Sequence, residues 1–270
     1  MTVFGRYLGR AREVVRYEGT ASLMWRALVA SLLPIGHVRI VTLYRKDLAG
    51  PLQPVEAKVA VQVHEAGEQD AEAVAALRAR LHGRDTSPVT RPLRSTDDDA
   101  ELVRSRNVVR ERFDLGHRCF VARIDGQIVH YNWLAFERVV FPSWGSNAQS
   151  RTVDPRRTIR LKREEAFCYD AYTLERWRGK AIHTKVLREM LSSLQGAAYR
   201  VAYTEVNVAR KSSWKTHERL GWEVAGTMLC ARVRGLGLSA VVSLGTRRPF
   251  DTEPGGNRVF RNPRRTTPST

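Results

Sequence analysis

The segment Arg178–His183, with sequence RGKAIH, places a glycine and two basic residues where a strand pattern changes to a helical one. The β-branched and aromatic run 166–174 precedes it, and an apolar period of helical spacing over 180–195 follows. A strand that enters a helix through such a turn leaves backbone N–H groups unpaired, and the positive end of the helix dipole reinforces them. The segment therefore predicts a cradle for an anion such as a diphosphate. We call it the hinge segment.

Two side chains of the hinge segment, Arg178 and Lys180, would add positive charge beside the bound anion. Connections of this kind, with a glycine and basic residues before a helix, are nevertheless common in proteins without an anion site. The order of the surrounding elements must therefore decide between the two interpretations.

The surrounding sequence alternates between strand and helical periods. Asp125 and Gly126 separate two alternating runs within 117–136 and predict a tight β-hairpin. Over 59–244 the predicted order is β, α, α, β, β, β, α, β, α, β, β, which is an α/β (α+β) fold with a mixed sheet. The predicted strands are 59–66, the two within 117–136, 166–174, 199–207, 221–233 and 238–244, and the predicted helices are 67–81, 98–112, 180–195 and 211–219.

The first part of the chain, 1–57, is predicted to be an extension of the main domain, 58–246. It has a basic amphipathic helix pattern over 4–33, a short strand over 38–44 and a linker composition over 49–56. Such a helix could rest on a membrane or on a carrier protein. We expect it to pack on its own domain, because most amphipathic helices bury their apolar face in this way.

Two further segments lack a sustained period. Residues 138–164 hold six Lys or Arg between Arg151 and Arg163 and are predicted to form a mobile basic excursion. The tail 247–270 is rich in Pro, Gly, Arg and Thr and is predicted to be disordered.

The composition restricts the class of protein. A formal net charge of +17 and a pI near 10.6 favour partners that carry phosphates or other anions. The three cysteines lie far apart without a CxxC pair, which disfavours a disulfide framework or a zinc site and indicates the reducing cytoplasm. No signal peptide is recognisable, and the longest apolar run, 21–36, contains Arg26 and is too short to cross a bilayer. The histidines have no metal-ligand spacing, so we expect no metal.

Within this order, two segments resemble the GCN5-related N-acetyltransferase (GNAT) superfamily, over about 185 of the 270 residues. The hinge segment stands where the family usually has Arg-Gly-x-Gly-x-Gly or Gln-x-x-Gly-x-Gly, with Ala181 and His183 in place of glycines. The run 204–223, TEVNVARKSSWKTHERLGWE, resembles the stretch that ends Tyr-x-x-x-Gly-Phe in the family, with His217 at the tyrosine position and a Gly-Trp end. An alanine at position 181 still allows close backbone approach if its φ is negative, and we expect His183 to lie one turn into the helix.

The resemblance implies a GNAT fold and an acyl-coenzyme A donor, such as acetyl-CoA, whose diphosphate the hinge segment holds. Because the family separates two strands there, a backbone N–H of Thr173 or Leu174 would donate to the thioester carbonyl. Asn207 and Ser212 would cap a helix or line the cleft. The implied cofactor-binding residues are Leu174, Thr173, Arg178, Gly179, Lys180, Ala181, Ile182, His183, Asn207 and Ser212.

Acyl transfer to an amine needs a base for the ammonium proton, polarisation of the thioester carbonyl and a proton for the leaving thiolate. The resemblance implies Glu205 as the base and His217 as the acid. Asp170, which strand alternation places on the same face as Tyr172, is a rival base. The structural alternatives are that Glu205 pairs with an arginine and that His217 packs at a helix end.

The expected function is N-acyl transfer from acyl-CoA to the amine of a small molecule, with acetyl as the expected acyl group, and the charge favours an anionic acceptor. Two alternatives stay open. The donor could be an acyl carrier protein, since such carriers are acidic and a positive surface would steer them. The chain could also be a GNAT-like module that binds nucleic acid without activity, although it lacks the sequence patterns typical of nucleic-acid binding.

Overall fold

The computed structural model of the chain describes residues 36–85, 95–140, 158–207, 211–233, 238–243 and 258–261. They belong to two compact units. The larger unit comprises Leu43–Glu205 and Ser212–Ala225, and the smaller comprises Val206–Lys211 with the described parts of Met1–Thr42 and Gly226–Thr270. The hinge segment lies in the larger unit, so the geometry of this unit decides the site.

The larger unit is built on strands in the order β8 (Val201–Asn207), β7 (Glu165–Thr173), β4 (Gln127–Ala135), β3 (Arg118–Ile124) and β2 (Gln62–Glu65). Strands β7 and β8 run parallel, and the other neighbours run antiparallel. The part of β1 (Gly36–Asp47) that belongs to this unit flanks β8. The sheet is therefore mixed, as the sequence predicted, with the hinge segment after the parallel strand β7.

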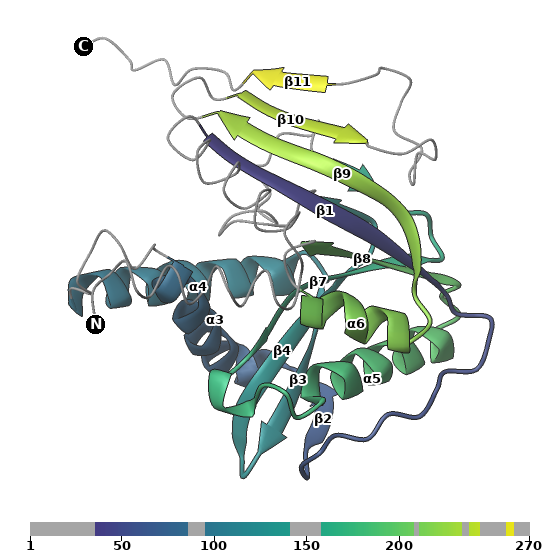
Figure 1. Ribbon diagram of the computed structural model, residues 1–270. Helices are drawn as coiled ribbons and strands as arrows, with labels where there is room; N and C mark the ends of the chain where they lie inside the picture. The colour runs from purple at the N-terminus through teal and green to yellow at the C-terminus, as the bar shows by residue number, and fades with distance from the viewer. Residues whose placement is uncertain are drawn as a thin grey trace, which may run out of the picture. The chain divides into compact units, whose positions relative to one another are not determined.

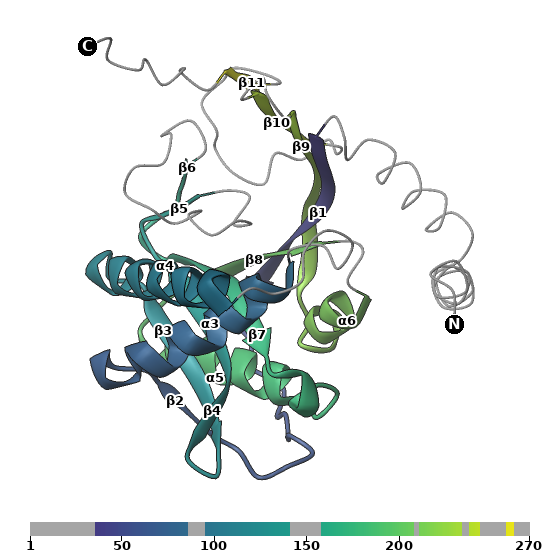
Figure 2. The same cartoon turned by 90° about the vertical axis from the view of Figure 1, so that its left-hand side faces the viewer.

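Helices cover both faces of this sheet (Figures 1 and 2). Helices α3 (Ala71–Asp85) and α4 (Ser95–Asp114) lie on one face, and α5 (Ile182–Gly196) and α6 (Lys211–Arg219) lie on the other (Figure 1). The apolar residues of α5 recur every three or four positions and form its buried stripe. They are Ile182, Val186, Leu187, Met190, Leu191 and Leu194.

The connections follow from residues that tolerate a left-handed backbone. Asp125 and Gly126, at φ +48° and +76°, form the two-residue turn between β3 and β4, as predicted. Short 3₁₀ turns, η1 (Glu68–Asp70) and η3 (Glu175–Trp177), lead into α3 and into the hinge segment. Of these two turns, η3 matters for the candidate site, because it sets the path of the chain between β7 and α5.

The smaller unit contains the end of β9 (Glu223–Val233), which pairs antiparallel with β10 (Leu238–Ser243). β10 pairs in turn with β11 (Arg258–Arg261). The tail from residue 247 was predicted to be disordered, yet β11 lies in it. Four residues are too few to give a sequence signal, and a strand of this kind is specified by the unpaired edge of β10.

Several boundaries also differ from the prediction. β2 keeps only four residues of the predicted strand 59–66. The excursion 138–164 contains two short paired strands, β5 (Arg138–Val140) and β6 (Thr158–Arg160), each too short to show a period. The predicted helix 4–33 and the middle of the excursion lie outside the described residues. Among the described helices, none is long and apolar enough to cross a membrane.

Candidate active site

The hinge segment joins β7 to α5 through two left-handed residues. Gly179 has φ +74° and Ala181 has φ +59°. The first backbone bond of the helix runs from the Lys185 N–H to the Ala181 carbonyl oxygen, 3.0 Å away. The N–H groups of the three preceding residues, 182–184, therefore stand ahead of the helical ladder at the positive end of the helix dipole. No side chain caps this end, so these backbone N–H groups have no side-chain acceptor.

The left-handed backbone of Ala181 does not meet the condition of a negative φ that the sequence argument set for an alanine at this position. The turn into α5 needs a left-handed residue, and this is why glycine suits such a position. Ala181 adopts the conformation at a steric cost of about 1–2 kcal/mol. His183 is also placed differently from the expectation, since it is the second residue of α5 rather than one turn into it.

Strands β7 and β8 separate beside the hinge segment. Their parallel pairing ends at Cys168 and Thr204, while β7 continues to Thr173. The gap that opens between them is where the family resemblance places the thioester. In the antiparallel β4–β7 ladder, the Leu174 N–H donates to the Val129 carbonyl oxygen at 2.9 Å. Leu174 therefore does not offer the expected donor.

Thr173 is the other predicted donor, and the ladder orients it suitably. It lies opposite His130, and N–H groups along an antiparallel strand point alternately toward and away from the neighbouring strand. Because the Leu174 N–H points toward β4, the N–H of Thr173 points away from β4. The Thr173 carbonyl oxygen, which points to the same side as its N–H, accepts a hydrogen bond of 3.1 Å from Arg178 Nε. Arg178 thus braces the end of β7.

Three histidines form a row across the α5 side of the sheet. The rings of His130 and His183 have centroids 5.3 Å apart, and those of His183 and His217 are 6.0 Å apart. Burial, with a smaller contribution from the neighbouring His217, lowers the pKa of His183 to about 3. Burial also lowers the pKa of His130 well below its usual range. These imidazoles are therefore neutral at pH 7.

His217 is held in one tautomer. Its Nδ1–H donates to the Ser213 carbonyl oxygen at 2.7 Å, and its ring stacks on Tyr44 and contacts Trp222. Burial lowers the pKa of His217 to about 4, against a smaller opposite effect of the Ser213 bond. Neutral His217 has its proton on Nδ1, so Nε2 has none to give. The predicted role as an acid requires a bound donor to raise this pKa.

The two predicted carboxylates have different surroundings. Glu205 is a partly buried residue of β8 and follows Thr204, the last residue paired with β7. It therefore lies where the two strands part. Asp170 lies on β7 at φ +46°, and its Oδ2 is 2.6 Å from Arg112. Because Asp170 is part of a buried ion cluster, Glu205 is the better placed of the two to receive a proton.

The remaining predicted residues contribute in different ways. Ile182 is 1% exposed, so only its backbone can face a ligand. Lys180 is exposed, and its carbonyl oxygen accepts from the Lys58 N–H at 2.9 Å. Asn207 ends β8 in the smaller unit and is not placed relative to the hinge segment. The side chain of Ser212, in α6, is outside the described part.

A cavity of about 720 Å³ adjoins the hinge segment. Its lining includes residues 56–62, the turn between β3 and β4, and Lys185 of α5. Lys58, Arg123 and Lys185 bring three positive charges to it, and Glu56 and Asp125 bring two negative ones. The hydrogen bond from Lys58 to Lys180 connects this wall directly to the hinge segment.

Sequence reasoning missed His130 and the buried arginines Arg78 and Arg112. His130 looked isolated because its neighbours, His183 and His217, are far away in the sequence. The arginines did leave a signal. Arg112 continues the buried positions 101, 105 and 108 along α4 at helical spacing, and a charge on such a stripe indicates a buried ion pair. Among the described residues, no group of His, Cys, Asp or Glu could hold a metal ion.

The left-handed alanines allow a test of the hinge geometry. Ala181→Gly should raise the free energy of unfolding by about 1 kcal/mol, because glycine takes a positive φ without the steric cost. Ala198→Gly, at φ +61° beyond the other end of α5, should stabilise by a similar amount. Ala57→Gly, at a position without a positive φ, is the control and should not stabilise. Urea titration measures all three, and destabilisation by Ala181→Gly would contradict the geometry.

The buried histidines predict a loss of stability in mild acid. The pKa of His217 is about 4 in the folded chain and about 6.5 when unfolded. Between these values the unfolded chain binds more protons, so stability falls as the pH falls. His217→Gln should reduce the loss between pH 7 and pH 5 by about 2 kcal/mol. Urea unfolding at both pH values measures it. Trp222→Phe is the control, and an equal loss in His217→Gln and the unmodified chain contradicts the prediction.

The comparisons with known proteins concern the fold. No protein-family model matches the sequence, and no curated protein gives a significant match. Solved structures do match, with eight of them at 10–16% identity. They include a GCN5-related N-acetyltransferase from Sphaerobacter thermophilus (15% identity, TM-score 0.48, 80% of this chain and 57% of that one). A GNAT-family acetyltransferase from Brucella melitensis in complex with acetyl-CoA also matches (13%, 0.41, 75% and 96%).

A protein from Novosphingobium aromaticivorans assigned to the GNAT family matches at 16% identity and a TM-score of 0.42. The match covers 73% of this chain and 66% of that one. The chain thus spans less than two thirds of the length of this protein and of the Sphaerobacter enzyme. The mixed sheet flanked by helices that the sequence predicted is the architecture that the structure has.

Proposed function

We propose that the protein is an N-acyltransferase that moves an acyl group, in the simplest case acetyl, from acyl-CoA to an amine. One observation carries the proposal. A set of helix N-terminal amides follows the end of β7, the strand that parts from β8 after Cys168, and Arg178 of the hinge segment contacts the last residue of that strand. The cradle suits a diphosphate, and the gap suits the thioester attached to it through pantetheine.

The cavity next to the hinge segment supports the nucleotide part of this proposal. Its volume of about 720 Å³ is in the range of small-molecule sites. Lys58 and Lys185 line it and would meet the phosphates of the donor from both sides. An acyl carrier protein holds its acyl group on phosphopantetheine without adenosine, so a filled cavity would favour acyl-CoA over such a carrier.

In the proposed reaction, the amine nitrogen attacks the thioester carbon and the C–S bond breaks. The Thr173 N–H stabilises the negative charge that develops on the carbonyl oxygen. Glu205 takes the proton from the amine, and the coenzyme A thiolate takes up a proton to leave as the thiol. The acceptor is proposed to be a small molecule that carries an amine and an anionic group, because the chain is strongly basic.

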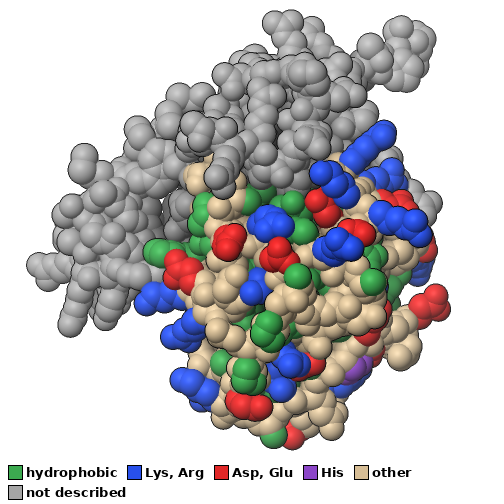
Figure 3. All heavy atoms as spheres, turned by 90° about the vertical axis from the view of Figure 1, so that its right-hand side faces the viewer, with side chains coloured by type: hydrophobic (Ala, Val, Ile, Leu, Met, Phe, Trp, Pro, Cys, Tyr) green, Lys and Arg blue, Asp and Glu red, His purple; other side chains and the backbone are tan. Residues whose placement is uncertain are grey.

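The charge distribution gives less support to a nucleic-acid-binding module. Most of the net positive charge belongs to residues outside the described ranges. On the face drawn in Figure 3, the described Lys and Arg side chains are interspersed with Asp and Glu. A backbone-binding site for nucleic acid needs cations gathered along one surface. We place the protein in the cytoplasm, where its buried thiols Cys119 and Cys168 would stay reduced.

Donor binding is tested by calorimetry with acetyl-CoA, followed by thiol release against a panel of amines. The double variant Arg178→Asp with Ala181→Asp should abolish binding, because it puts negative charge at the cradle. Arg200→Asp with Ala197→Asp makes the same change at the other end of α5 and should bind normally. Equal binding by both double variants contradicts the proposed site. Turnover of acyl-carrier protein without turnover of acyl-CoA would assign the donor to the carrier.

The base is tested with Glu205→Gln. This variant should lower kcat by about 10²- to 10⁴-fold and leave the affinity for acetyl-CoA unchanged, because the carboxylate acts on the amine rather than on the donor. Glu164→Gln, an exposed residue that pairs with Arg200, is the matched control and should keep full turnover. Full activity of Glu205→Gln would remove Glu205 from the mechanism.

A further inference from the structure

Strand β7 is kinked at Asp170, shortly before the hinge segment. Asp170 has φ +46°, in the left-handed region that few side chains adopt. The β4–β7 register shifts between Tyr131 and Trp133, so that two residues of β7 oppose one residue of β4. Such an insertion is a β-bulge. It begins just after Cys168, the last residue of β7 that pairs with β8.

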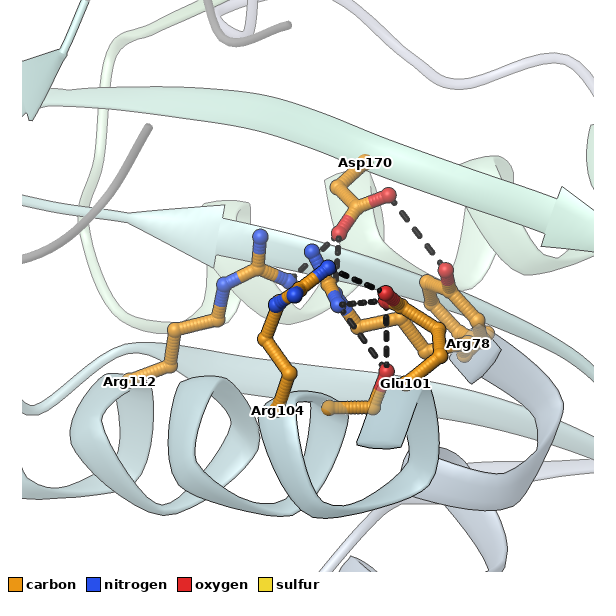
Figure 4. A network of polar contacts seen from close by, with 7 residues as sticks. Arg78, Glu101, Arg104, Arg112 and Asp170 are labelled. Atoms are coloured by element: carbon orange, nitrogen blue, oxygen red, sulfur yellow. Dashed lines mark hydrogen bonds and ion pairs between the residues drawn. The ribbon is translucent and has the colours of Figure 1, made fainter. Parts of the chain in front are cut away.

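A buried ion cluster holds the side chain at this kink (Figure 4). Asp170 Oδ2 is 2.6 Å from an Arg112 guanidinium nitrogen and 3.7 Å from Arg78 Nε. The Tyr131 hydroxyl donates to Oδ1 at 3.3 Å. The side chains of Arg78 and Arg112 are 0% and 1% exposed. The carboxylate thus neutralises charges that α3 and α4 bury against the sheet.

The two arginines do not depend on Asp170 equally. Arg78 also donates to Ser105 Oγ at 3.0 Å and lies 3.7 Å from Glu101 Oε1, both on α4 (Figure 4). The guanidinium of Arg112 lies 5.1 Å from the centre of the Trp133 ring. Burial alone lowers the pKa of Arg112, but the net shift is upward because of Tyr169 and Asp170. Arg112 is therefore a buried cation whose carboxylate partner is Asp170, and such a cation strongly needs one.

The kink determines which backbone N–H groups face the gap between β7 and β8. An inserted residue reverses the alternation of every residue that follows it in the strand. With the bulge, the Leu174 N–H points toward β4 and the Thr173 N–H points away from β4. Without it, the register would slip by one residue and the Thr173 N–H would turn toward β4.

We propose that Asp170 is a positioning residue, which its ion pair with Arg112 holds in the left-handed kink so that the Thr173 N–H faces the thioester. The inference rests on the proposed function. It replaces the interpretation of Asp170 as a base, because a proton on this carboxylate would remove the charge that faces two buried guanidinium groups.

Two variants of Asp170 separate the interpretations. Asn tolerates a left-handed backbone and still offers an oxygen to Arg112, so Asp170→Asn should keep kcat within about tenfold, whereas loss of a base costs about 10²- to 10⁴-fold. Asp170→Val cannot adopt the kink and should lose kcat by at least about 100-fold. A base would be lost equally in both variants, and equal loss overturns the proposal.

A second readout needs no acceptor. In protein labelled with nitrogen-15 threonine, the Thr173 amide signal is identified by its absence in Thr173→Ser. This signal should respond to acetyl-CoA more strongly than to coenzyme A, because only the former has the carbonyl. Asp170→Asn should keep the response. Asp170→Val and Arg112→Met should lose it while binding coenzyme A within about threefold of the unmodified chain, a difference below 1 kcal/mol. A retained response in both overturns the proposal.

The matched control is Ala198→Val. Ala198 has a similar left-handed backbone, φ +61°, but it is exposed and lies beyond the C-terminal end of α5. It should keep both turnover and the Thr173 response. Measurements on the unmodified chain distinguish failure of the proposed function from failure of the inference about Asp170. If it does not bind acetyl-CoA, the proposed function fails and the inference fails with it. If it binds and turns over acetyl-CoA but Asp170→Asn is inactive, only the inference fails.

Discussion

The buried ion pair between Arg112 and Asp170 is the constraint on which the candidate site depends. A guanidinium group that is 1% exposed needs a carboxylate beside it. Among the described residues, the carboxylate that pairs with Arg112 is that of Asp170, a residue of β7 with a left-handed backbone. The buried positive charge of Arg112 on α4 is thus neutralised by a residue in the bulge of β7. The bulge in turn sets the direction of the peptide groups that follow it in the strand.

The same strand leads into the hinge segment, so two backbone features lie in sequence along one short stretch. Asp170 sets the orientation of Thr173, and Arg178 returns from the hinge segment to bind the Thr173 carbonyl oxygen. Gly179 and Ala181 then turn the chain into α5. Backbone donors, rather than side chains, therefore make most of the proposed contacts with the donor. In this proposal the backbone of Ala181, rather than its side chain, faces the donor, and the left-handed conformation of this alanine carries a steric cost.

The two faces of the sheet differ in the kind of polar group that they bury. The face toward α3 and α4 buries charges and pairs them, as Arg78, Arg112 and Asp170 show. The face toward α5 and α6 buries His130, His183 and His217 in their neutral forms. A neutral, poorly solvated row beside the gap would favour the uncharged thioester and disfavour water. The charged side chains that could contact the donor then lie in the hinge segment and in the cavity wall.

The sequence by itself determined the order of the elements, the Asp125–Gly126 turn and the position of the hinge segment, because periodicity and turn residues are local properties. It also placed Glu205 on the strand that the structure has as β8. It did not determine that Ala181 is left-handed, that the Leu174 N–H is already bonded or that Asp170 neutralises Arg112. Those facts depend on strand register and on side chains that are far apart in the sequence, and only tertiary packing decides which of them meet.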